Sequence, residues 1–162
     1  MLNRLVVSLD FVPVVPVFTQ RIDTPPDIAP YWCLSLSAEE RTRSRLHCKS
    51  DEGHPLYLQL PRGLTLKDGD WLRTDQGQFL QVRAKAEPVL TVMADFPLAL
   101  LQAAYHLGNR HVPLEITANY LRLAPDPVLR DMLTHRGLKL HDEVAPFQPE
   151  LGAYGSTEHH HH

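Results

Sequence analysis

Ala104-Tyr105-His106-Leu107-Gly108-Asn109-Arg110-His111-Val112-Pro113-Leu114 is the stretch in which a predicted helix gives way to a predicted strand. Upstream of its end, apolar residues follow the i, i+3, i+4, i+7 spacing of a helix with one buried face, at Leu100, Ala103, Ala104 and Leu107. Gly108 and Asn109 are residue types that tolerate the left-handed conformation at a helix end. Alternating apolar residues over 112–116 then predict a strand.

Two histidines lie on either side of this helix end. Imidazole is the commonest protein ligand for late first-row transition metals, so the pair suggests metal handling. His106 falls in the last helical turn, where the helix dipole favours an imidazolium, and a capping role therefore competes with metal binding. His111 lies in the connection beyond the helix, where a histidine is either a solvated side chain or a ligand. The pattern alone leaves both interpretations open.

The elements around this stretch predict a ferredoxin-like βαββαβ domain over residues 75–150. In order, we expect a β-rich segment at 79–93, a helix from 97 to about 107, strands at 112–116 and 121–123, a helix from 127 to 136 and a strand from 138. Asp95 and Pro97 mark the start of the first helix, and Asp126 and Pro127 that of the second. The fold assigns no function by itself.

The N-terminal half has a different character, and residues 1–74 predict a small all-β domain. Prolines interrupt it too often for long helices, at Pro13, Pro16, Pro25, Pro26 and Pro30. The polar turn at 75–78 is the best candidate for the boundary between the two domains. Residues 151–162 form an expected flexible tail, so the fold class is α+β, with a β domain followed by a ferredoxin-like domain.

Composition restricts the partners of the chain. The 162 residues carry a formal net charge of −3, so a nucleic acid is not a favoured partner. No apolar run approaches the roughly 18 residues that a membrane span needs, and residues 1–10 lack the apolar core of a signal peptide. Cys33 and Cys48 form no CxxC motif, which indicates reduced thiols and a cytoplasmic protein.

The chain contains ten histidines, and four of them, His159, His160, His161 and His162, end it. Such a run is either an expression tag or a native tail that binds metal with low specificity. The sequence before it does not distinguish these origins. His141 follows the last predicted strand and is a weaker candidate ligand, whereas His47, His54 and His135 are interpreted as surface residues.

Further motifs accompany the helix end and together resemble the urease accessory protein E family over nearly the whole chain. The matching segments are 106–113, 120–123, 126, 131–133, 137–138 and 145–154 in the second half, and 41–45, 58–63 and 68–70 in the first. The most specific are the His-x-x-Gly-Asn-Arg-His core from His106 to His111 and the Ala-Pro-Phe-x-Pro-Glu segment from Ala145 to Glu150.

This resemblance implies a nickel metallochaperone for urease maturation, not an enzyme. The family has a peptide-binding-like β domain and a ferredoxin-like domain that forms a homodimer. It places the histidine matching His111 at the dimer interface, where two copies share one Ni²⁺. A two-fold axis pairs His111 with itself, and a site with few ligands releases its ion readily. Zn²⁺ or Cu²⁺ is also expected to occupy the site in vitro.

Other ligands and partners are implied by the same resemblance. His106 is a further candidate metal residue, and the final histidines, with Glu158, would add ligands near the dimer axis. Some members carry a histidine where this chain has Pro127, which puts their secondary metal sites in doubt here. The expected partners are a urease accessory GTPase and apo-urease with other accessory proteins. The chain has no Walker A sequence, so GTP chemistry belongs to the partner.

Two other functions compete with the metallochaperone. A metal-dependent hydrolase needs three protein ligands, an open coordination position and a general base, and no His-Glu-x-x-His or comparable motif is present. A metal-free interaction module would bind a peptide at a sheet edge of the β domain and use the second domain only for dimerisation.

Overall fold

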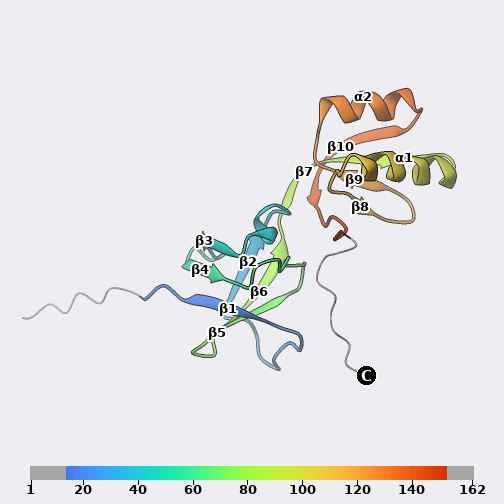
Figure 1. The fold of residues 1–162 in the computed structure, drawn as a ribbon. Helices are drawn as coiled ribbons and strands as arrows, with labels where there is room; N and C mark the ends of the chain where they lie inside the picture. Colours follow the sequence, from blue (N-terminus) through green and yellow to red (C-terminus); the bar gives the residue numbers. More distant parts are fainter. Residues whose placement is uncertain (1–13, 153–162) are drawn as a thin grey trace, which may run out of the picture.

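The computed structural model describes residues 14–152, which form two β-sheets, with two α-helices beside the second sheet (Figure 1). The expected α+β fold class, a β unit followed by a ferredoxin-like unit, is confirmed.

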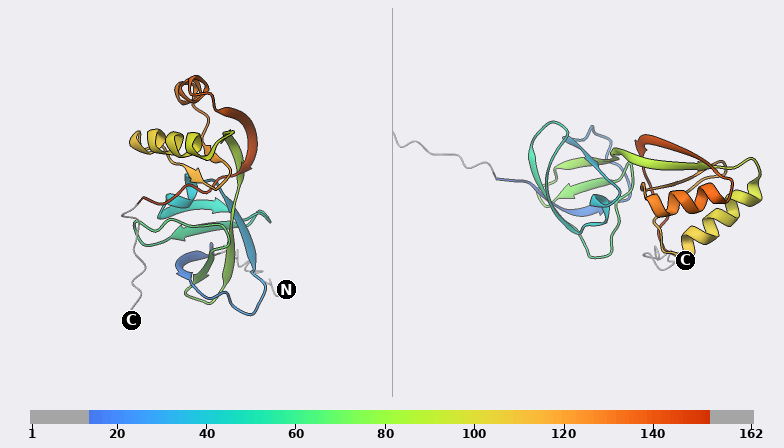
Figure 2. Two further views of the ribbon diagram at one scale, coloured as in Figure 1. Left: turned by 90° about the vertical axis from the view of Figure 1, so that its right-hand side faces the viewer. Right: turned by 90° about the horizontal axis from the view of Figure 1, so that it is seen from above.

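The N-terminal sheet curls into a near-barrel around a core of leucine side chains with Phe18 and Val82 (Figure 2). Its strands are β1 (Val17–Ile22), β2 (Trp32–Leu36), β3 (Arg45–Lys49), β4 (Pro55–Gln59), β5 (Trp71–Thr74) and β6 (Phe79–Ala84), with the 3-10 turn η1 (Glu40–Thr42) between β2 and β3. The strand order is β2-β6-β5-β1-β4-β3, with β1–β4 and β2–β6 parallel. Alternate residues such as Leu56 and Leu58 point into the core because successive strand residues face opposite sides.

The polar turn at residues 75–78 lies inside this sheet. It closes an antiparallel hairpin between β5 and β6, and the Gly77 amide donates to the Thr74 carbonyl at 3.0 Å. Gly77 has a φ of +82°, which glycine adopts without a steric penalty. Polar turn residues are typical of hairpins and linkers alike, and here they form a hairpin. The N-terminal sheet therefore extends to Ala84, and we propose Lys85 as the boundary in place of the turn.

The second sheet and its helices have ferredoxin-like topology. The elements are β7 (Ala86–Met93), α1 (Pro97–Asn109), β8 (Glu115–Ile116), β9 (Leu121–Leu123), α2 (Pro127–His135) and β10 (Lys139–Pro146). The sheet order β10-β7-β9-β8 is antiparallel throughout. Leu90 and Val92 of β7 share one core with Leu107 of α1 and Leu133 of α2, so both helices cover the same face.

Both helices begin at the expected proline, Pro97 and Pro127, but only one of the two expected aspartate caps is present. The Asp126 carboxylate accepts a hydrogen bond from the Leu129 amide at 2.9 Å and caps α2, with Pro127 at its first position, as expected. For α1 the cap position is Phe96, which has no side-chain hydrogen bond. Asp95 instead pairs with Lys139 at 2.5 Å. The last strand, β10, is also longer than expected because it pairs with β7 over its whole length.

The two units are joined at two places. The β6–β7 connection is the single residue Lys85, whose amide donates to the Leu36 carbonyl at 2.9 Å. After β10 the chain returns to the N-terminal unit, where the Asp68 amide donates to Gln148 Oε1 at 3.1 Å and the Arg41 guanidinium donates to the Phe147 carbonyl.

The core contact of α1 gives a stability prediction. Leu107 is 0% exposed, so Leu107→Ala is expected to lower the free energy of unfolding by about 3 kcal/mol, from lost burial and the cavity left behind. The matched control is Gln102→Ala, on the exposed side of the same helix, which is expected to change it by less than about 0.5 kcal/mol. Chemical denaturation checks both values, and equal losses would contradict this packing.

Candidate metal centre

The end of α1 is fixed by a pair of backbone hydrogen bonds that reach past the last helical residue. The His111 amide donates to the Gly108 carbonyl at 2.9 Å, and the Val112 amide donates to the Leu107 carbonyl at 3.2 Å. This pattern is the Schellman motif. Val112 packs against the core that contains Leu107, which is the apolar contact that accompanies the motif. His111 is therefore held at a defined point beyond the helix.

His111 occupies the left-handed position of this motif, which glycine usually takes. Its φ is +55°, and it is the only non-glycine residue with positive φ among residues 14–152. Helix α2 ends with the same two hydrogen bonds, and there the equivalent residue is Gly137, with φ +75°. The left-handed conformation costs a residue with a Cβ about 1 kcal/mol. Backbone strain at an exposed polar residue points to a functional role.

The sequence analysis expected the left-handed conformation at Gly108 or Asn109, and this prediction was wrong. Both are still part of α1, because their carbonyl and amide groups continue the helical hydrogen bonding and the turn comes after Arg110. Gly108 therefore does not need a left-handed conformation. The signal that identifies His111 as the left-handed residue is Val112, whose apolar side chain closes the motif two residues after Arg110.

The His111 side chain is exposed and makes no hydrogen bond, ion pair or ring contact with any residue of the described range 14–152. A neutral imidazole in this state can offer a ring nitrogen to a metal ion without breaking an existing contact. The rigid backbone at the helix end limits the directions in which the ring can point. His111 thus has the geometry of a free ligand on a fixed support.

His106 is in a different state. Its Nε2 faces the guanidinium of Arg136, which follows α2, and its ring contacts Tyr105 edge-on with centroids 5.4 Å apart. Because a guanidinium only donates, Nε2 serves as an acceptor and its lone pair is already used. Binding a metal through that nitrogen requires loss of the Arg136 contact. Its role as a partner of the α2 end was not apparent from the sequence, which suggested only capping of its own helix.

The remaining histidines are distributed over the molecule. His141 is exposed on β10, opposite Thr91. His135 Nδ1 contacts the Asp131 carbonyl at 2.7 Å, and His47 stacks on Tyr57 with ring centroids 4.2 Å apart. His54 lies beside Trp32. The final four histidines fall outside the described residues.

The cysteines do not supply a thiolate near His111. Both lie in the N-terminal unit, Cys33 on β2 and Cys48 on β3. Burial, with a smaller contribution from Glu40, raises the pKa of the Cys48 thiol to about 11. Since a metal binds the thiolate, Cys48 is a poor ligand at neutral pH.

A single chain does not assemble a complete metal site within residues 14–152. No group of three or more histidine, cysteine, aspartate or glutamate side chains in that range is arranged to hold a metal ion. Ligands for an ion at His111 must therefore come from solvent, from the remainder of the chain or from another molecule.

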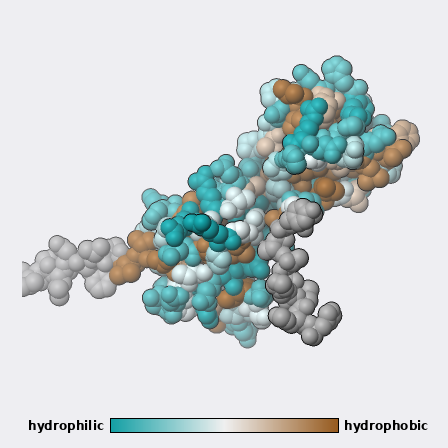
Figure 3. All heavy atoms as spheres, viewed as in Figure 1, coloured by the Kyte–Doolittle hydropathy of each residue, from teal (hydrophilic) through white to brown (hydrophobic). Residues whose placement is uncertain are grey.

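An apolar stripe runs along the exposed side of α1 toward His111. Leu98, Leu101 and Tyr105 lie three and four residues apart, hence on one face, and are 64%, 67% and 67% exposed. Figure 3 shows hydrophobic side chains on the outer surface of the C-terminal unit, where α1 lies. Apolar residues grouped in this way are typical of protein–protein interfaces. The stripe ends at the helix terminus that carries His111.

Two family models match the chain, and their matches meet at the connection between the units. Residues 18–85 match the N-terminal domain of UreE urease accessory protein, and residues 87–162 match its C-terminal domain. The chain is 60% identical over 137 residues to urease accessory protein UreE of Thermosynechococcus vestitus, covering 84% of this chain and 95% of the relative. It is 54% identical over 145 residues to UreE of Nostoc sp. (strain PCC 7120), covering 89% and 96%.

The strain at His111 gives a prediction that separates the effect of its backbone conformation on stability from the effect of its imidazole. His111→Gly and His111→Ala both remove the imidazole, but only glycine accepts a φ of +55° without a Cβ clash. The glycine variant is expected to be more stable to unfolding than the alanine variant by about 1 kcal/mol. Thermal or urea unfolding of metal-free protein measures the difference. An alanine variant equal to or more stable than the glycine variant would show that position 111 is unstrained.

Proposed function

We infer how this protein works from the fact that it belongs to the UreE urease accessory protein family. It is a nickel metallochaperone for urease maturation, and its work is to carry an ion, not to catalyse a reaction. Family membership thereby sets aside the metal-dependent hydrolase as an interpretation.

We propose that Ni²⁺ is carried between two chains, with His111 of each as a ligand. The observation that supports this proposal most strongly is the exposed imidazole at the strained end of α1, which has no partner within residues 14–152. The described part of one chain offers no cluster of ligands around it. A two-fold axis at this point doubles the histidine without any further residue. The apolar stripe of Leu98, Leu101 and Tyr105 supplies the surface on which the two copies meet.

A site of this kind suits a carrier. Imidazole binds Ni²⁺ well, and water or carboxylate oxygens complete its coordination. Two protein ligands hold the ion less firmly than a closed site of four, so a partner that offers more ligands can remove it. His106 is a second candidate, but its Nε2 is engaged by Arg136. His159, His160, His161 and His162 are proposed as weaker additional ligands. Zn²⁺ and Cu²⁺ are expected to occupy the site in vitro.

The proposed partners are the other components of urease maturation. Family membership implies interaction with urease accessory proteins. We propose that the nickel-loaded homodimer passes its ion through an accessory GTPase toward apo-urease. No helix within residues 14–152 is both long and apolar enough to cross a membrane. We propose that the transfer takes place in the cytoplasm.

Nickel titration calorimetry at pH 7, on a chain that ends at Tyr154, tests the proposed site. We expect one tightly held ion per two chains. His111→Ala is expected to weaken binding by about 100-fold or more, since one substitution removes two ligands from a symmetric site. His106→Ala is the matched control and is expected to have a much smaller effect, because that imidazole already has a partner. Equal losses in the two variants would refute the ranking.

The dimer interface is tested in two steps, first by sedimentation of the metal-free protein and then by nickel binding. Leu101→Glu or Tyr105→Glu places a charge on the apolar stripe and is expected to shift the protein from dimer to monomer in sedimentation velocity. Each variant keeps His111 but is expected to lose tight nickel binding, since the second ligand departs with the second chain. Val144→Glu, on the exposed side of β10, serves as the control. A dimer that survives both α1 substitutions would place the interface elsewhere.

A further inference from the structure

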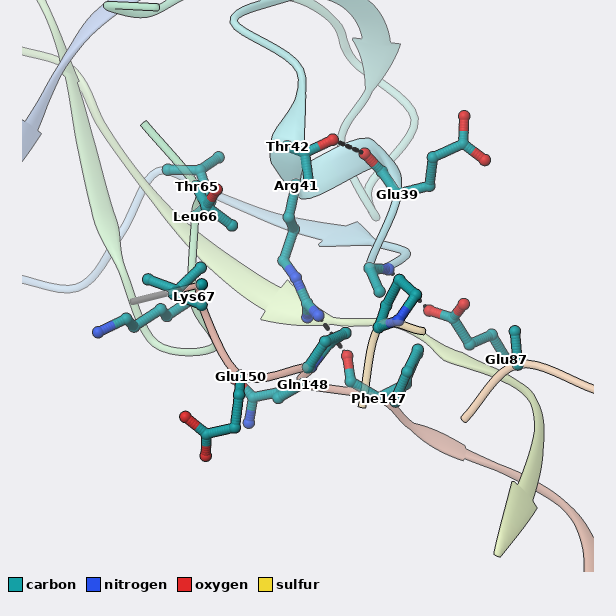
Figure 4. Close-up of a pocket in the computed structure, with 16 residues that line it drawn as sticks. Glu39, Arg41, Thr42, Thr65, Leu66, Lys67, Glu87, Phe147, Gln148 and Glu150 are labelled. Atoms are coloured by element: carbon teal, nitrogen blue, oxygen red, sulfur yellow. Dashed lines mark hydrogen bonds between the residues drawn. The ribbon is translucent and has the colours of Figure 1, made fainter. Parts of the chain in front are cut away.

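Two arginines make side-chain contacts that join segments far apart in sequence, and their surroundings differ. Arg41, from η1, is only 3% exposed, lies in the wall of a cavity of about 890 Å³ between the two units and donates to the Phe147 carbonyl (Figure 4). Its contact joins the units. Arg136 follows α2 and is exposed, and its guanidinium faces the imidazole of His106, a candidate metal ligand. The contact of Arg136 therefore bears on metal binding.

The position of Arg136 is fixed by the end of α2. Its amide donates to the Met132 and Leu133 carbonyls at 3.3 and 3.2 Å, and Gly137 then takes the left-handed conformation, with a φ of +75°. Helix α2 thus ends in the same motif as α1. His106 lies in the last turn of α1, so the contact joins the C-terminal ends of the two helices. Both partners of the contact consequently have a backbone held by helical hydrogen bonds.

The contact makes both ring nitrogens of His106 unavailable to a metal ion. A guanidinium has donors only, so Arg136 Nη2 donates and His106 Nε2 accepts with its lone pair. A neutral imidazole whose Nε2 accepts carries its proton on Nδ1, and a protonated ring nitrogen has no lone pair for a metal. Arg136 therefore occupies one nitrogen of His106 and determines the protonation of the other.

The positive charge of Arg136 acts in the same direction. Arg130, on α2, pairs with Asp142, whereas no carboxylate within residues 14–152 forms an ion pair with Arg136. A guanidinium in contact with the His106 ring repels a second cation that approaches this ring. His111 has no side-chain contact within the same residues. The end of α1 thus offers one available imidazole and one that is engaged.

We propose that Arg136 is a positioning residue that withholds His106 from nickel, so that only His111 of each chain holds the ion. This role rests on the proposed nickel site at His111. Two imidazoles leave coordination positions to solvent, whereas the two further imidazoles that a symmetric dimer would add with His106 would hold the ion more firmly. Arg136 thereby keeps the ion transferable, because a receiving partner displaces fewer protein ligands.

Nitrogen-15 NMR of the histidines in the metal-free full chain tests the contact itself. At about pH 8, where an ordinary histidine is neutral, His106 is expected to carry its proton on Nδ1. Arg136→Met removes the charge and the donors but keeps a long side chain, and it is expected to shift the proton toward Nε2. Arg110→Met is the matched control, since Arg110 is the cap residue of α1 and does not contact His106. His106→Ala assigns the signals.

The NMR result overturns the proposal if His106 carries its proton on Nε2 in the unaltered chain, or if the two methionine variants change its protonation alike. Because this experiment contains no nickel, its outcome is independent of the proposed function. Failure of the proposed nickel site is recognised separately, by a His111→Ala variant that binds nickel as tightly as the unaltered chain.

Nickel affinity tests the consequence of the contact. Competition with a coloured chelator measures the most tightly held ion of the full chain, in which the final histidines are the same for every variant. Arg136→Met is expected to tighten this ion by about tenfold, because His106 becomes a further ligand. The double variant Arg136→Met/His106→Ala is expected to lose that gain.

Three outcomes of the nickel titration would overturn the proposal. The first is no gain in Arg136→Met, as expected if the arginine only ties the helix ends together. The second is a gain that persists without His106, and the third is an equal gain in Arg110→Met. The last two would show that removal of a positive charge, and not release of an imidazole, strengthens the binding.

Discussion

The Schellman motif at the end of α1 connects the core of the C-terminal unit to the proposed function. Leu107 is buried in the core while its carbonyl accepts from the Val112 amide, so the residues between them have little freedom. His111 lies within this closed loop in a left-handed conformation that its Cβ disfavours. The core therefore determines where the imidazole is held. Anything that loosens α1 is expected to loosen the proposed ligand as well.

The same helix also presents the apolar stripe. It therefore contributes a buried face to the core, an exposed face to the proposed dimer interface, and the support for His111 at its end. Its buried face carries Leu100, Ala103 and Leu107, and its exposed face carries Leu98, Leu101 and Tyr105. Under the proposed function, the second copy meets this exposed face and brings its own His111. The distance between the two ligands is then set by helix packing and not by loops. A carrier benefits from this, because two ligands bind only when the dimer has formed.

Much of the fold was predictable from local signals, and the failures have physical causes. Asp126 and Pro127 identified the start of α2, because a cap and a fixed φ are local properties. The turn at 75–78 closes the β5–β6 hairpin, and because turn residues alone do not show which strands they connect, we propose the boundary at Lys85. The contact of His106 with Arg136 and the burial of Arg41 depend on residues distant in sequence, so local patterns do not reveal them. The family resemblance pointed to His111, but only the structure showed its left-handed backbone.

The most direct test of the central claim is diffraction at the nickel absorption edge from crystals of the nickel-loaded chain ending at Tyr154. The account predicts one anomalous peak on a two-fold axis, with the His111 imidazoles of both chains within bonding distance, about 2.1 Å for a metal–nitrogen bond. A peak held within one chain, or one ligated by His106 without His111, would contradict it.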